Sequence, residues 1–253
     1  MARLLSGAPA TGLDHPIRIA LLGSTGSIGR QTLDVIRSNP GRFDVVALAA
    51  GRNIELLAQQ VREFSPAALC CADNDALHTL ISELPAEDAP VASTLVEMAT
   101  DPSVDVVISA IVGGEGLVPA MAALSAGKAV ALANKEAMVM AGALVTEAAA
   151  RGGGSIRPVD SEHSAIWQCL DGRDAATIRR LLITASGGAL RDMAPSELGE
   201  VTPERALAHP TWLMGRRITI DSATLFNKGL EVIEARWLFD VPFERIDVVM
   251  HRE

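Results

Sequence analysis

The amino-acid sequence predicts an α/β protein in which a parallel β-sheet domain precedes an α+β domain. Three observations support this. Short apolar runs alternate with segments of helical periodicity, a glycine-rich loop follows the first apolar run, and the alternation ends near three glycines, Gly152–Gly154. Strands that alternate with helices indicate a parallel sheet with right-handed crossovers. We therefore expect a first domain over 17–158, a second over 159–253, and a loose tail over 1–16.

The composition of the 253 residues limits the possible functions. Hydrophobic residues make up 49% of the chain, which is typical of a globular protein with a core. The formal net charge of −9 and the absence of tyrosine argue against a nucleic-acid partner, and the charge also argues against an anionic membrane. The three cysteines form neither a disulfide framework nor a zinc pattern, so we expect them to be reduced and buried in a cytoplasmic protein.

The first strand–loop–helix unit indicates a dinucleotide site. The apolar run Ile17–Leu22 leads directly into Gly23-Ser24-Thr25-Gly26-Ser27-Ile28-Gly29, and a helical segment, Arg30–Arg37, follows. Glycines let the backbone turn tightly and approach a pyrophosphate, which sits at the N-terminus of the helix. The spacing is one residue longer than the commonest fingerprint, and a plain tight turn is the alternative. We favour a Rossmann-like domain that binds a dinucleotide.

The end of the second expected strand, Phe43–Ala49, predicts which dinucleotide is bound. This strand runs into Ala50-Gly51-Arg52-Asn53, and no acidic residue lies between Val45 and Ile54. An acidic residue there would bind the ribose 2′-hydroxyl of NAD, whereas an arginine suits the 2′-phosphate of NADP. Arg52 could also be an ordinary solvated side chain, but after the glycine loop it favours NADP.

The alternation continues through the rest of the first domain. Helices are expected over 54–64, 74–84, 94–99 and 116–126, and a long helix is expected after Ala133–Glu136 and through Ala150. Strands are expected over 67–71, near 91, and over 104–108, 128–132 and 155–159. Ligands of open parallel sheets bind along the carboxyl ends of the strands. The loops Ser109–Gly116 and Ala133–Glu136 lie at such ends. Lys135 and Glu136 could be functional there, or could be an ordinary exposed pair at a helix start.

The stretch Asp160-Ser161-Glu162-His163-Ser164 lies between an expected strand and an expected helix. Two carboxylates one residue apart at a strand end can hold a hard cation through oxygen. Such a cation can polarise a carbonyl or hydroxyl of a small substrate. The alternative is that Asp160 or Ser161 caps the helix while Glu162 occupies its first turn.

Two loops of the second domain carry further candidates. An expected strand over 178–183 runs into Thr184-Ala185-Ser186-Gly187-Gly188, which offers a hydroxyl and N–H groups to an anion, or is a simple turn. The segment His209–Gly215 combines an imidazole, the indole of Trp212 and a glycine. It suits a mobile lid over a ligand, and a surface loop with one anchored tryptophan is the alternative.

The last part of the chain is expected to contain a strand, a helix and a final strand. The strand Arg217–Ile220 runs into Asp221-Ser222, and the last run, Ile246–Met250, has no obvious pairing partner. An apolar face of the helix over 224–239 is formed by Phe226, Leu230, Ile233 and Trp237. Asn227, Lys228 and Glu231 project to nearby points beside it, either as a surface group or as phosphate, hydroxyl and metal ligands.

Six motifs, in order along the chain, together resemble the 1-deoxy-D-xylulose-5-phosphate reductoisomerase family. They are Gly23–Gly29, Ala133–Glu136, Asp160–Ser164, Thr184–Gly188, His209–Pro210 with Trp212 and Met214–Gly215, and Asp221–Thr224 with Asn227–Glu231. Each motif is weak alone, but six in order are specific. The resemblance implies an NADPH-dependent enzyme that uses Mg²⁺, Mn²⁺ or Co²⁺. Such an enzyme isomerises and reduces 1-deoxy-D-xylulose 5-phosphate to 2-C-methyl-D-erythritol 4-phosphate in non-mevalonate isoprenoid biosynthesis.

The resemblance also implies roles for individual residues. NADPH would be bound by Thr25, Gly26, Ser27, Ile28, Gly51, Arg52, Asn53, Asn134, Glu136 and Gly215. The metal would be bound by Asp160, Glu162 and Glu231. The phosphorylated sugar would contact Lys135, Ser161, Glu162, Ser186, His209, Ser222, Asn227, Lys228 and Glu231, and the catalytic residues would be Lys135, Glu162, Glu231 and His209.

The sequence departs from the family at its C-terminal end. Members of the family continue into further catalytic sheet and a helical domain, so we expect the second domain to be incomplete and the helical C-terminal domain to be absent. The resemblance implies a cytoplasmic enzyme that is a homodimer in its full-length form. Two alternatives remain. One is another NADP-dependent reductase of the semialdehyde dehydrogenase type, for which none of the cysteines is well placed, and the other is a non-catalytic NADP-binding fragment.

Overall fold

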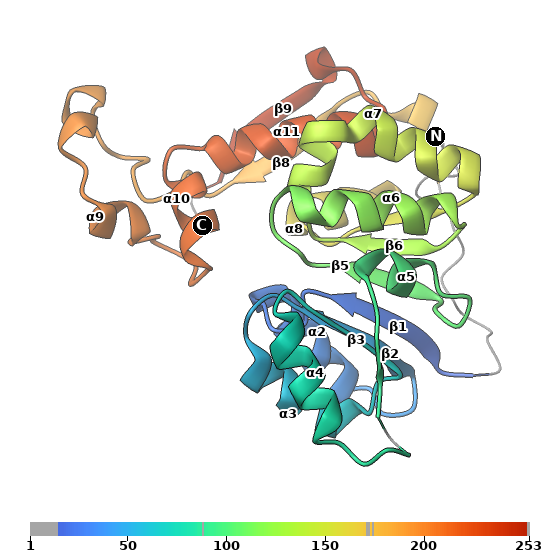
Figure 1. Ribbon diagram of the computed structural model, residues 1–253. Coiled ribbons are helices and arrows are strands. Elements are labelled where there is room, and N and C mark those ends of the chain that lie inside the picture. Colours follow the sequence, from blue (N-terminus) through green and yellow to red (C-terminus); the bar gives the residue numbers. More distant parts are fainter. Residues whose placement is uncertain (1–14, 88, 171–172, 174, 252–253) are drawn as a thin grey trace. The chain divides into compact units, whose positions relative to one another are not determined.

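The computed structural model describes residues 15–87, 89–170, 173 and 175–251, and the chain divides into two compact units, Met1–Asp160 and Ser161–Glu253 (Figure 1). All but the last two residues of the tail expected over 1–16 lie outside the described part. No helix in the described part of the chain combines the length and the apolar character that a membrane crossing requires.

The first unit is built on a seven-stranded sheet in which every pair of neighbouring strands is parallel. The strands are β1 Ile17–Leu22, β2 Phe43–Ala50, β3 Ala68–Cys71, β4 Val91–Ala92, β5 Val106–Ser109, β6 Ala129–Leu132 and β7 Ser155–Pro158. Their order is β4-β3-β2-β1-β5-β6-β7, so the chain winds outward from β1 in one direction and then returns to fill the other side. The predicted α/β class with a Rossmann-like parallel sheet is therefore confirmed.

Helices connect consecutive strands of this sheet. They are α2 Ser27–Arg37, α3 Ile54–Phe64, α4 Asn74–Ser82, α5 Leu95–Thr100, α6 Leu117–Ser125 and α7 Lys135–Gly152, with a short 3₁₀ turn, η1, at Gly114–Gly116. Figure 1 shows α2, α3 and α4 grouped on one face of the sheet and α5, α6 and α7 on the other. Right-handed crossovers produce this division because the direction of winding changes once, between β4 and β5.

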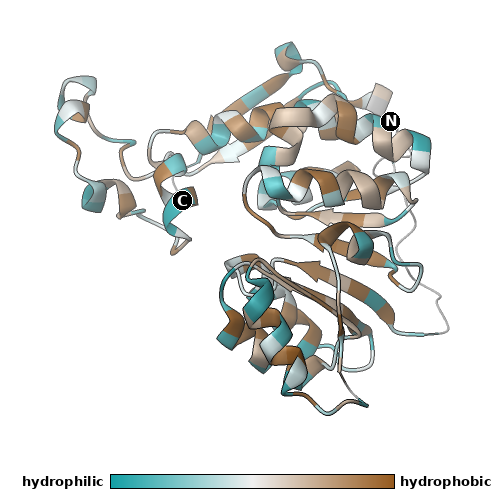
Figure 2. Cartoon of the chain, viewed as in Figure 1, coloured by the Kyte–Doolittle hydropathy of each residue, from teal (hydrophilic) through white to brown (hydrophobic). Residues whose placement is uncertain are grey.

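The core of the first unit follows from the two faces of its strands. Ile19 and Leu21 of β1 point into a cluster with Leu33 of α2 and Leu57 of α3, and all four side chains are buried. Burying one such side chain contributes roughly 1.5–3 kcal/mol. Figure 2 shows the strands of this sheet mainly in hydrophobic colours, as expected for a sheet covered on both faces.

Polar residues at strand ends fix where several helices begin. The side chain of Asn53 accepts a hydrogen bond from the N–H of Leu56 at 3.1 Å, and that of Asn134 accepts one from Ala137 at 2.8 Å. Such caps satisfy N–H groups that have no partner within the helix. Helix α2 differs, because its N-cap is Gly26, which offers no side chain to its first-turn N–H groups.

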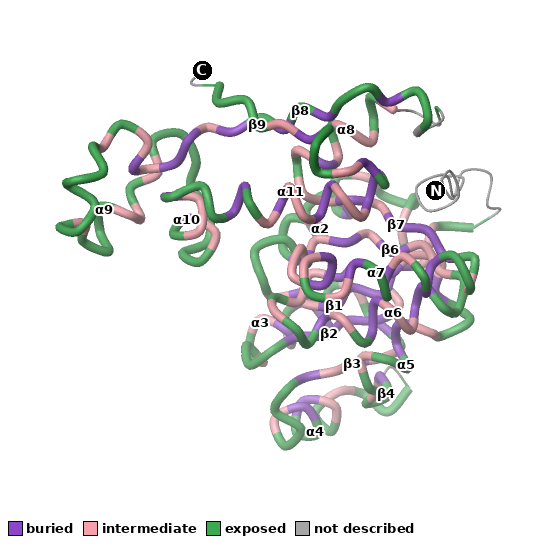
Figure 3. Tube along the Cα trace, turned by 90° about the horizontal axis from the view of Figure 1, so that it is seen from above, coloured by how far each residue is buried: buried purple, intermediate pink, exposed green. Residues whose placement is uncertain are grey.

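The second unit contains a small parallel sheet and several helices. Its elements are α8 Ser161–Leu170, η2 Ala175–Thr177, β8 Leu181–Ala185, η3 Pro195–Glu200, α9 Pro203–Leu207, α10 Arg216–Ala223, α11 Phe226–Phe239, η4 Phe243–Arg245 and β9 Ile246–Met250. The burial colours of Figure 3 show that the segment containing α9 and α10 is mostly exposed. Strand β9 pairs in parallel with β8, from Leu181 with Ile246 to Ala185 with Met250, so the expectation of an unpaired last strand was wrong.

The strand expected over Arg217–Ile220 is also wrong, because these residues belong to helix α10. The alternation of isoleucine with polar residues suggested a period of two. The structure instead buries Thr219 and Ala223, which are four residues apart on one helix face, and leaves Ile220 42% exposed. The hydroxyl of Thr219 donates to the carbonyl of Gly215 at 2.9 Å, so this β-branched residue is accommodated within a helix.

Two expectations about burial need correction. Cys169 is exposed on α8, whereas Cys71 is buried and Cys70 is half-buried. On α11, Phe226 is 61% exposed, and the charged Lys228 and Glu231 are buried together with the apolar Leu238 and Phe239. The helix was predicted correctly, but its buried face combines the site residues with apolar residues at its C-terminal end and does not include Phe226.

Candidate functional site

The carboxyl ends of the central strands in the first unit form one continuous edge. Leu22 of β1 pairs with Ser109 of β5, Ser109 pairs with Leu132 of β6, and Leu132 pairs with Pro158 of β7. The glycine loop follows Leu22 at the point where the winding of the sheet reverses. Ligands of open parallel sheets bind at this point. The predicted cofactor residues of the first unit all lie in loops or first helical turns along this edge.

Glycines in the first loop are required by close backbone packing. Gly23 has a φ of +96°, and a Cβ there would lie 2.6 Å from the carbonyl oxygen of Ala110. A Cβ on Gly29 would lie 2.2 Å from the carbonyl oxygen of Gly23. These distances are far below a normal van der Waals contact, so the loop, the start of α2 and the end of β5 can pack together only without side chains at these positions.

The other predicted cofactor residues of the first unit differ in their exposure. Thr25 is half-buried, Ser27 and Ile28 are exposed, and Gly51 and Arg52 are exposed beside the capping residue Asn53. Asn134 is 2% exposed and its amide donates to the carbonyl oxygens of Ile111 and Gly113. Glu136 is half-buried in the first turn of α7. Asn134 therefore fixes the loop that follows β5 as well as the start of α7.

Lys135 and Asp160 form an ion pair within the first unit. The Lys135 Nζ lies 2.7 Å from the Asp160 Oδ2, and the two side chains are only 12% and 15% exposed. Asp160 is the last residue of this unit. A carboxylate expected to bind a metal is thus held here by a lysine expected to contact substrate.

In the second unit, Lys228 lies between two carboxylates. Its Nζ contacts Glu162 Oε1 at 2.7 Å, forms a second ion pair with Glu231, and donates to the carbonyl oxygen of Thr184 at 2.6 Å. The Glu231 carboxylate also accepts a hydrogen bond from Asn227 at 2.5 Å. We call Glu162, Asn227, Lys228 and Glu231 the Lys228 cluster. It brings together four of the predicted site residues, although Glu162 is 66 residues from Lys228.

The burial of this cluster identifies it as more than a surface ion pair. Asn227, Lys228 and Glu231 are 9%, 7% and 1% exposed. Ligand oxygens of Glu162 and Glu231 lie within 4.8 Å of each other, close enough to share one cation. Burying charges costs free energy that a packed apolar cluster would not cost. Such an arrangement is typical of a functional site, and Lys228 neutralises one of its two negative charges.

Sequence reasoning assigned no role to His163, although this residue lies within the Asp160–Ser164 motif. Its side chain is 0% exposed, its Nε2 lies 2.9 Å from the carbonyl oxygen of Glu231, and its ring stacks on Phe239 at 6.2 Å. The Nδ1 lies 3.5 Å from Glu234, which is also buried. His163 therefore connects α8 to the turn of α11 that carries Glu231. For its partner Glu234, the signal available in the sequence was its position one helical turn after Glu231, on the same face of α11.

Ser186 and His209 are brought together at the end of β8. The Ser186 Oγ lies 3.1 Å from His209 Nε2, and His209 Nδ1 accepts hydrogen bonds from the N–H groups of Thr211 and Trp212 at 3.2 and 3.0 Å. Because Nδ1 is an acceptor, the proton lies on Nε2 and is donated to Ser186. Arg191, which sequence reasoning also missed, donates to the carbonyl oxygen of Ser186 at 2.7 Å.

Ser222 lies against the same loop. A Cβ on Gly188 would lie 1.9 Å from the carbonyl oxygen of Ser222, and Gly188 has a φ of +75°. Ser161 donates its hydroxyl proton to Glu162 at 2.6 Å. In the loop before α10, Trp212 is 61% exposed and Leu213 is fully exposed, and Gly215 forms the N-cap of α10.

The surroundings of His209 predict a measurable pH dependence. Burial and, second, the positive charge of Arg191 hold the pKa of His209 below its ordinary value, so the ring is neutral at pH 7. The variant Arg191→Gln should raise the pKa of His209, because one of the two causes is removed. An NMR titration of the imidazole resonances would measure this change, with Arg205→Gln on α9 as the control. An unchanged or lowered pKa in Arg191→Gln would contradict the assignment.

Two family models match this chain. The model described as 1-deoxy-D-xylulose 5-phosphate reductoisomerase matches residues 19–142, and the model described as the C-terminal domain of the same enzyme matches residues 156–239. Together they include both the glycine loop and the Lys228 cluster.

Curated relatives and solved structures agree with these models. The 1-deoxy-D-xylulose 5-phosphate reductoisomerases of Geobacillus kaustophilus (strain HTA426) and Anaeromyxobacter dehalogenans (strain 2CP-1 / ATCC BAA-258) are 53% and 54% identical over 237 and 238 residues. Each match covers 93% of this chain, but the chain spans only 62% and 61% of those relatives. A DOX-P reductoisomerase solved in complex with NADPH, fosmidomycin and magnesium has a TM-score of 0.86 and 40% identity, covering 93% of this chain and 61% of that one. The enzyme from Zymomonas mobilis in complex with NADPH has a TM-score of 0.85 and 42% identity, covering 94% of this chain and 62% of that one.

Proposed function

Because this chain belongs to the 1-deoxy-D-xylulose 5-phosphate reductoisomerase family, we propose that it carries the active-site residues of that enzyme. The proposed reaction is the NADPH- and metal-dependent isomerisation and reduction of 1-deoxy-D-xylulose 5-phosphate to 2-C-methyl-D-erythritol 4-phosphate. The observation that carries the proposal is the Lys228 cluster, in which the buried Lys228 contacts both the buried Glu231, itself bonded to the buried amide of Asn227, and the half-buried Glu162.

Our cofactor proposal is NADPH bound along the sheet edge of the first unit. Thr25, Gly26, Ser27 and Ile28 would hold the pyrophosphate at the start of α2, whose N-cap supplies no competing side chain. The exposed Arg52, between Gly51 and Asn53, would receive the 2′-phosphate. Asn134 and Glu136 would lie towards the nicotinamide, with Gly215 contributed by the second unit.

For the metal, we propose Glu162 and Glu231 of the second unit together with Asp160, which precedes Glu162 by two residues. Their oxygens suit Mg²⁺, Mn²⁺ or Co²⁺, and the proximity of the Glu162 and Glu231 oxygens supports a shared cation. A bound divalent ion would chelate the vicinal hydroxyl and carbonyl of the substrate and stabilise the charge that develops as the carbon–carbon bond breaks.

The substrate phosphate would be held by Ser186, Ser222, Asn227 and Lys228, with His209 beside them. Both Ser186 and His209 carry O–H or N–H groups that can donate to phosphate oxygens, and Arg191 donates to the backbone carbonyl of Ser186. Lys135, Ser161 and Glu162 would face the reacting hydroxyls and carbonyl. The segment His209–Gly215 would be a lid that closes over bound substrate and excludes water, and the exposed indole of Trp212 would pack over that substrate.

The alternatives are supported less well. A semialdehyde dehydrogenase needs a nucleophilic cysteine, but burial raises the pKa of Cys70, Cys71 is buried in the sheet, and Cys169 lies on the outside of α8. A non-catalytic NADP-binding fragment remains a separate proposal, since the chain spans 62% of the Geobacillus kaustophilus relative. A cytoplasmic location and a homodimer of the full-length form are further proposals from the family.

Turnover of 1-deoxy-D-xylulose 5-phosphate tests the proposed function. We expect NADPH consumption that requires Mg²⁺, Mn²⁺ or Co²⁺, measured on this chain and on a version extended to the length of its relatives. In the active form, Glu231→Gln should weaken metal binding by more than the roughly 10–100-fold that loss of an outer-shell partner costs. Asp247→Asn, which removes an exposed ion pair to Arg180, is the control. Metal binding and turnover that are unchanged in Glu231→Gln would refute the role of Glu231.

A further inference from the structure

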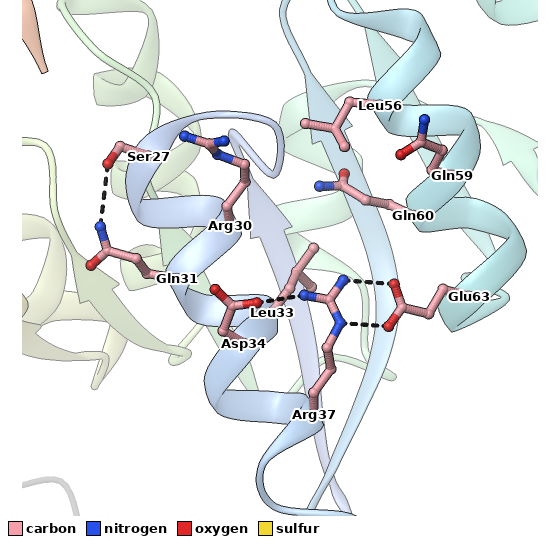
Figure 4. A pocket seen from close by; sticks show the side chains of 10 residues that line it. All are labelled: Ser27, Arg30, Gln31, Leu33, Asp34, Arg37, Leu56, Gln59, Gln60 and Glu63. Atoms are coloured by element: carbon pink, nitrogen blue, oxygen red, sulfur yellow. Dashed lines mark hydrogen bonds and ion pairs between the residues drawn. The ribbon is translucent and has the colours of Figure 1, made fainter.

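A pocket of about 390 Å³ opens between helices α2 and α3 (Figure 4). It lies in the first unit, on the face of the sheet that α2, α3 and α4 cover. Its lining includes Ser27, the first residue of α2, and Leu56, whose N–H is capped by Asn53. The pocket therefore adjoins both segments proposed to bind the dinucleotide, the glycine loop and the turn after β2.

The two ends of this pocket differ in charge. At one end, Arg37 donates to both carboxylate oxygens of Glu63 at 2.5 and 2.6 Å and to Asp34 at 2.6 Å (Figure 4). These contacts raise the pKa of Arg37 and lower that of Glu63, as expected for a tight bidentate pair. The positive charge of Arg37 is thus balanced by the carboxylates of Glu63 and Asp34.

Arg30 lies at the other end, beside Ser27, and is one turn into α2 (Figure 4). Its side chain is exposed, and no described residue forms a hydrogen bond or an ion pair with it. Arg30 therefore carries an uncompensated positive charge close to the N-terminus of a helix. Both features attract an anion, and a phosphate in particular.

The walls of the pocket are held at a fixed spacing. Gln60 of α3 is 3% exposed, and its amide donates to the carbonyl oxygen of Ser24 in the glycine loop at 3.0 Å. This bond ties α3 directly to the loop from which α2 begins. The backbone from which Arg30 extends is therefore held in place relative to α3, while its exposed side chain can reach a ligand group that enters between the two helices.

We propose that Arg30 is a second arginine, besides Arg52, that recognises the phosphomonoester on the adenosine ribose of NADP. The inference rests on the proposed function and adds a specificity-determining residue to it. NADH lacks this phosphate, so Arg30 discriminates between the two cofactors while contributing little to the binding of NADH.

Titrations of purified residues 1–253 with NADPH and NADH, followed by nicotinamide fluorescence, test this assignment. We expect Arg30→Gln to weaken NADPH binding roughly 5- to 10-fold, the effect of one exposed charge-assisted contact, and to leave NADH binding within about twofold. Adenosine 2′,5′-bisphosphate and adenosine 5′-monophosphate, used as competing probes, should show the same difference. Arg62→Gln, which removes an exposed arginine of α3 outside the pocket, controls for net charge.

The Arg52→Gln variant distinguishes a failure of the proposed cofactor from a failure of the proposed role of Arg30. Equal affinity of the wild type for NADPH and NADH would refute the proposed cofactor, and the role of Arg30 with it. A wild type that prefers NADPH, an Arg52→Gln variant that loses this preference and an Arg30→Gln variant that retains it in full would refute the role of Arg30 alone. Equal losses in Arg30→Gln and Arg62→Gln would likewise overturn it, because the effect would then be one of net charge.

Discussion

Replacing Lys228 with methionine is expected to destabilise the second unit by about 3–5 kcal/mol, the usual cost of leaving a buried charge without its partner. Lys228 contacts both Glu162 and Glu231, and Glu231 is 1% exposed. Methionine keeps most of the side-chain volume, so the loss of charge dominates the effect. All three tryptophans lie in the second unit, so urea unfolding followed by tryptophan fluorescence reports on it.

The matched control for Lys228→Met is Asp240→Asn at the end of the same helix. Asp240 is 62% exposed and pairs with Arg236 at 2.9 Å. An exposed pair of this kind contributes about 0–1 kcal/mol, and asparagine tolerates the left-handed φ of 49° at this position. Lys228→Met together with Glu231→Gln should recover part of the lost stability. If the single variant Lys228→Met were as stable as Asp240→Asn, the buried charge of Glu231 would not need Lys228 for its stabilisation, and the prediction would be wrong.

Gly188→Ala is expected to lower the free energy of unfolding of the second unit by a comparable amount, about 2–5 kcal/mol. Two costs combine there. The φ of +75° disfavours any side chain by roughly 1–2 kcal/mol, and the 1.9 Å approach of a Cβ to the carbonyl oxygen of Ser222 forces the backbone apart at roughly 1–3 kcal/mol. The displaced loop also carries Ser186, so phosphate binding should weaken.

Gly199→Ala serves as the control for this substitution. A Cβ on Gly199 meets no atom within 4 Å, and its φ lies outside the left-handed region. The variant should unfold within about 0.5 kcal/mol of the wild type, the usual range for a surface substitution. Tryptophan-monitored urea curves of both variants provide the measurement. Equal urea midpoints for Gly188→Ala and Gly199→Ala would contradict the prediction, because the backbone at Gly188 would then accept a side chain without loss of stability.

The fold of the first unit could be predicted because local and global signals agree there. Each expected strand or helix from Ile17 to Pro158 has a counterpart, and the caps Asn53 and Asn134 mark helix starts. In the second unit these signals conflict. The alternation at Arg217–Ile220 is typical of a strand, but tertiary packing selects a helix that buries Thr219.

The composition of the candidate site was easier to predict than its contacts. The motifs identified Glu162, Lys228 and Glu231, but the carbonyl of Thr184 that also holds Lys228 carries no sequence signal. The apolar residues of α11 suggested a buried face that includes Phe226, whereas the site requires the opposite face to be buried. Arg191 acts through a backbone oxygen, a kind of contact that side-chain patterns do not reveal.

The position of Lys228 between two carboxylates has a consequence for how the proposed enzyme would acquire its metal. The ammonium group of Lys228 already offsets the repulsion between the carboxylates of Glu162 and Glu231. We therefore expect the second unit to fold without a bound ion, in contrast to small zinc domains whose folding free energy is their metal-binding free energy. Glu162 and Glu231 would hold the cation, and the ammonium group of Lys228 would have to leave them when the cation binds. Lys228 would then be available to an anion, so metal binding and phosphate binding would be linked.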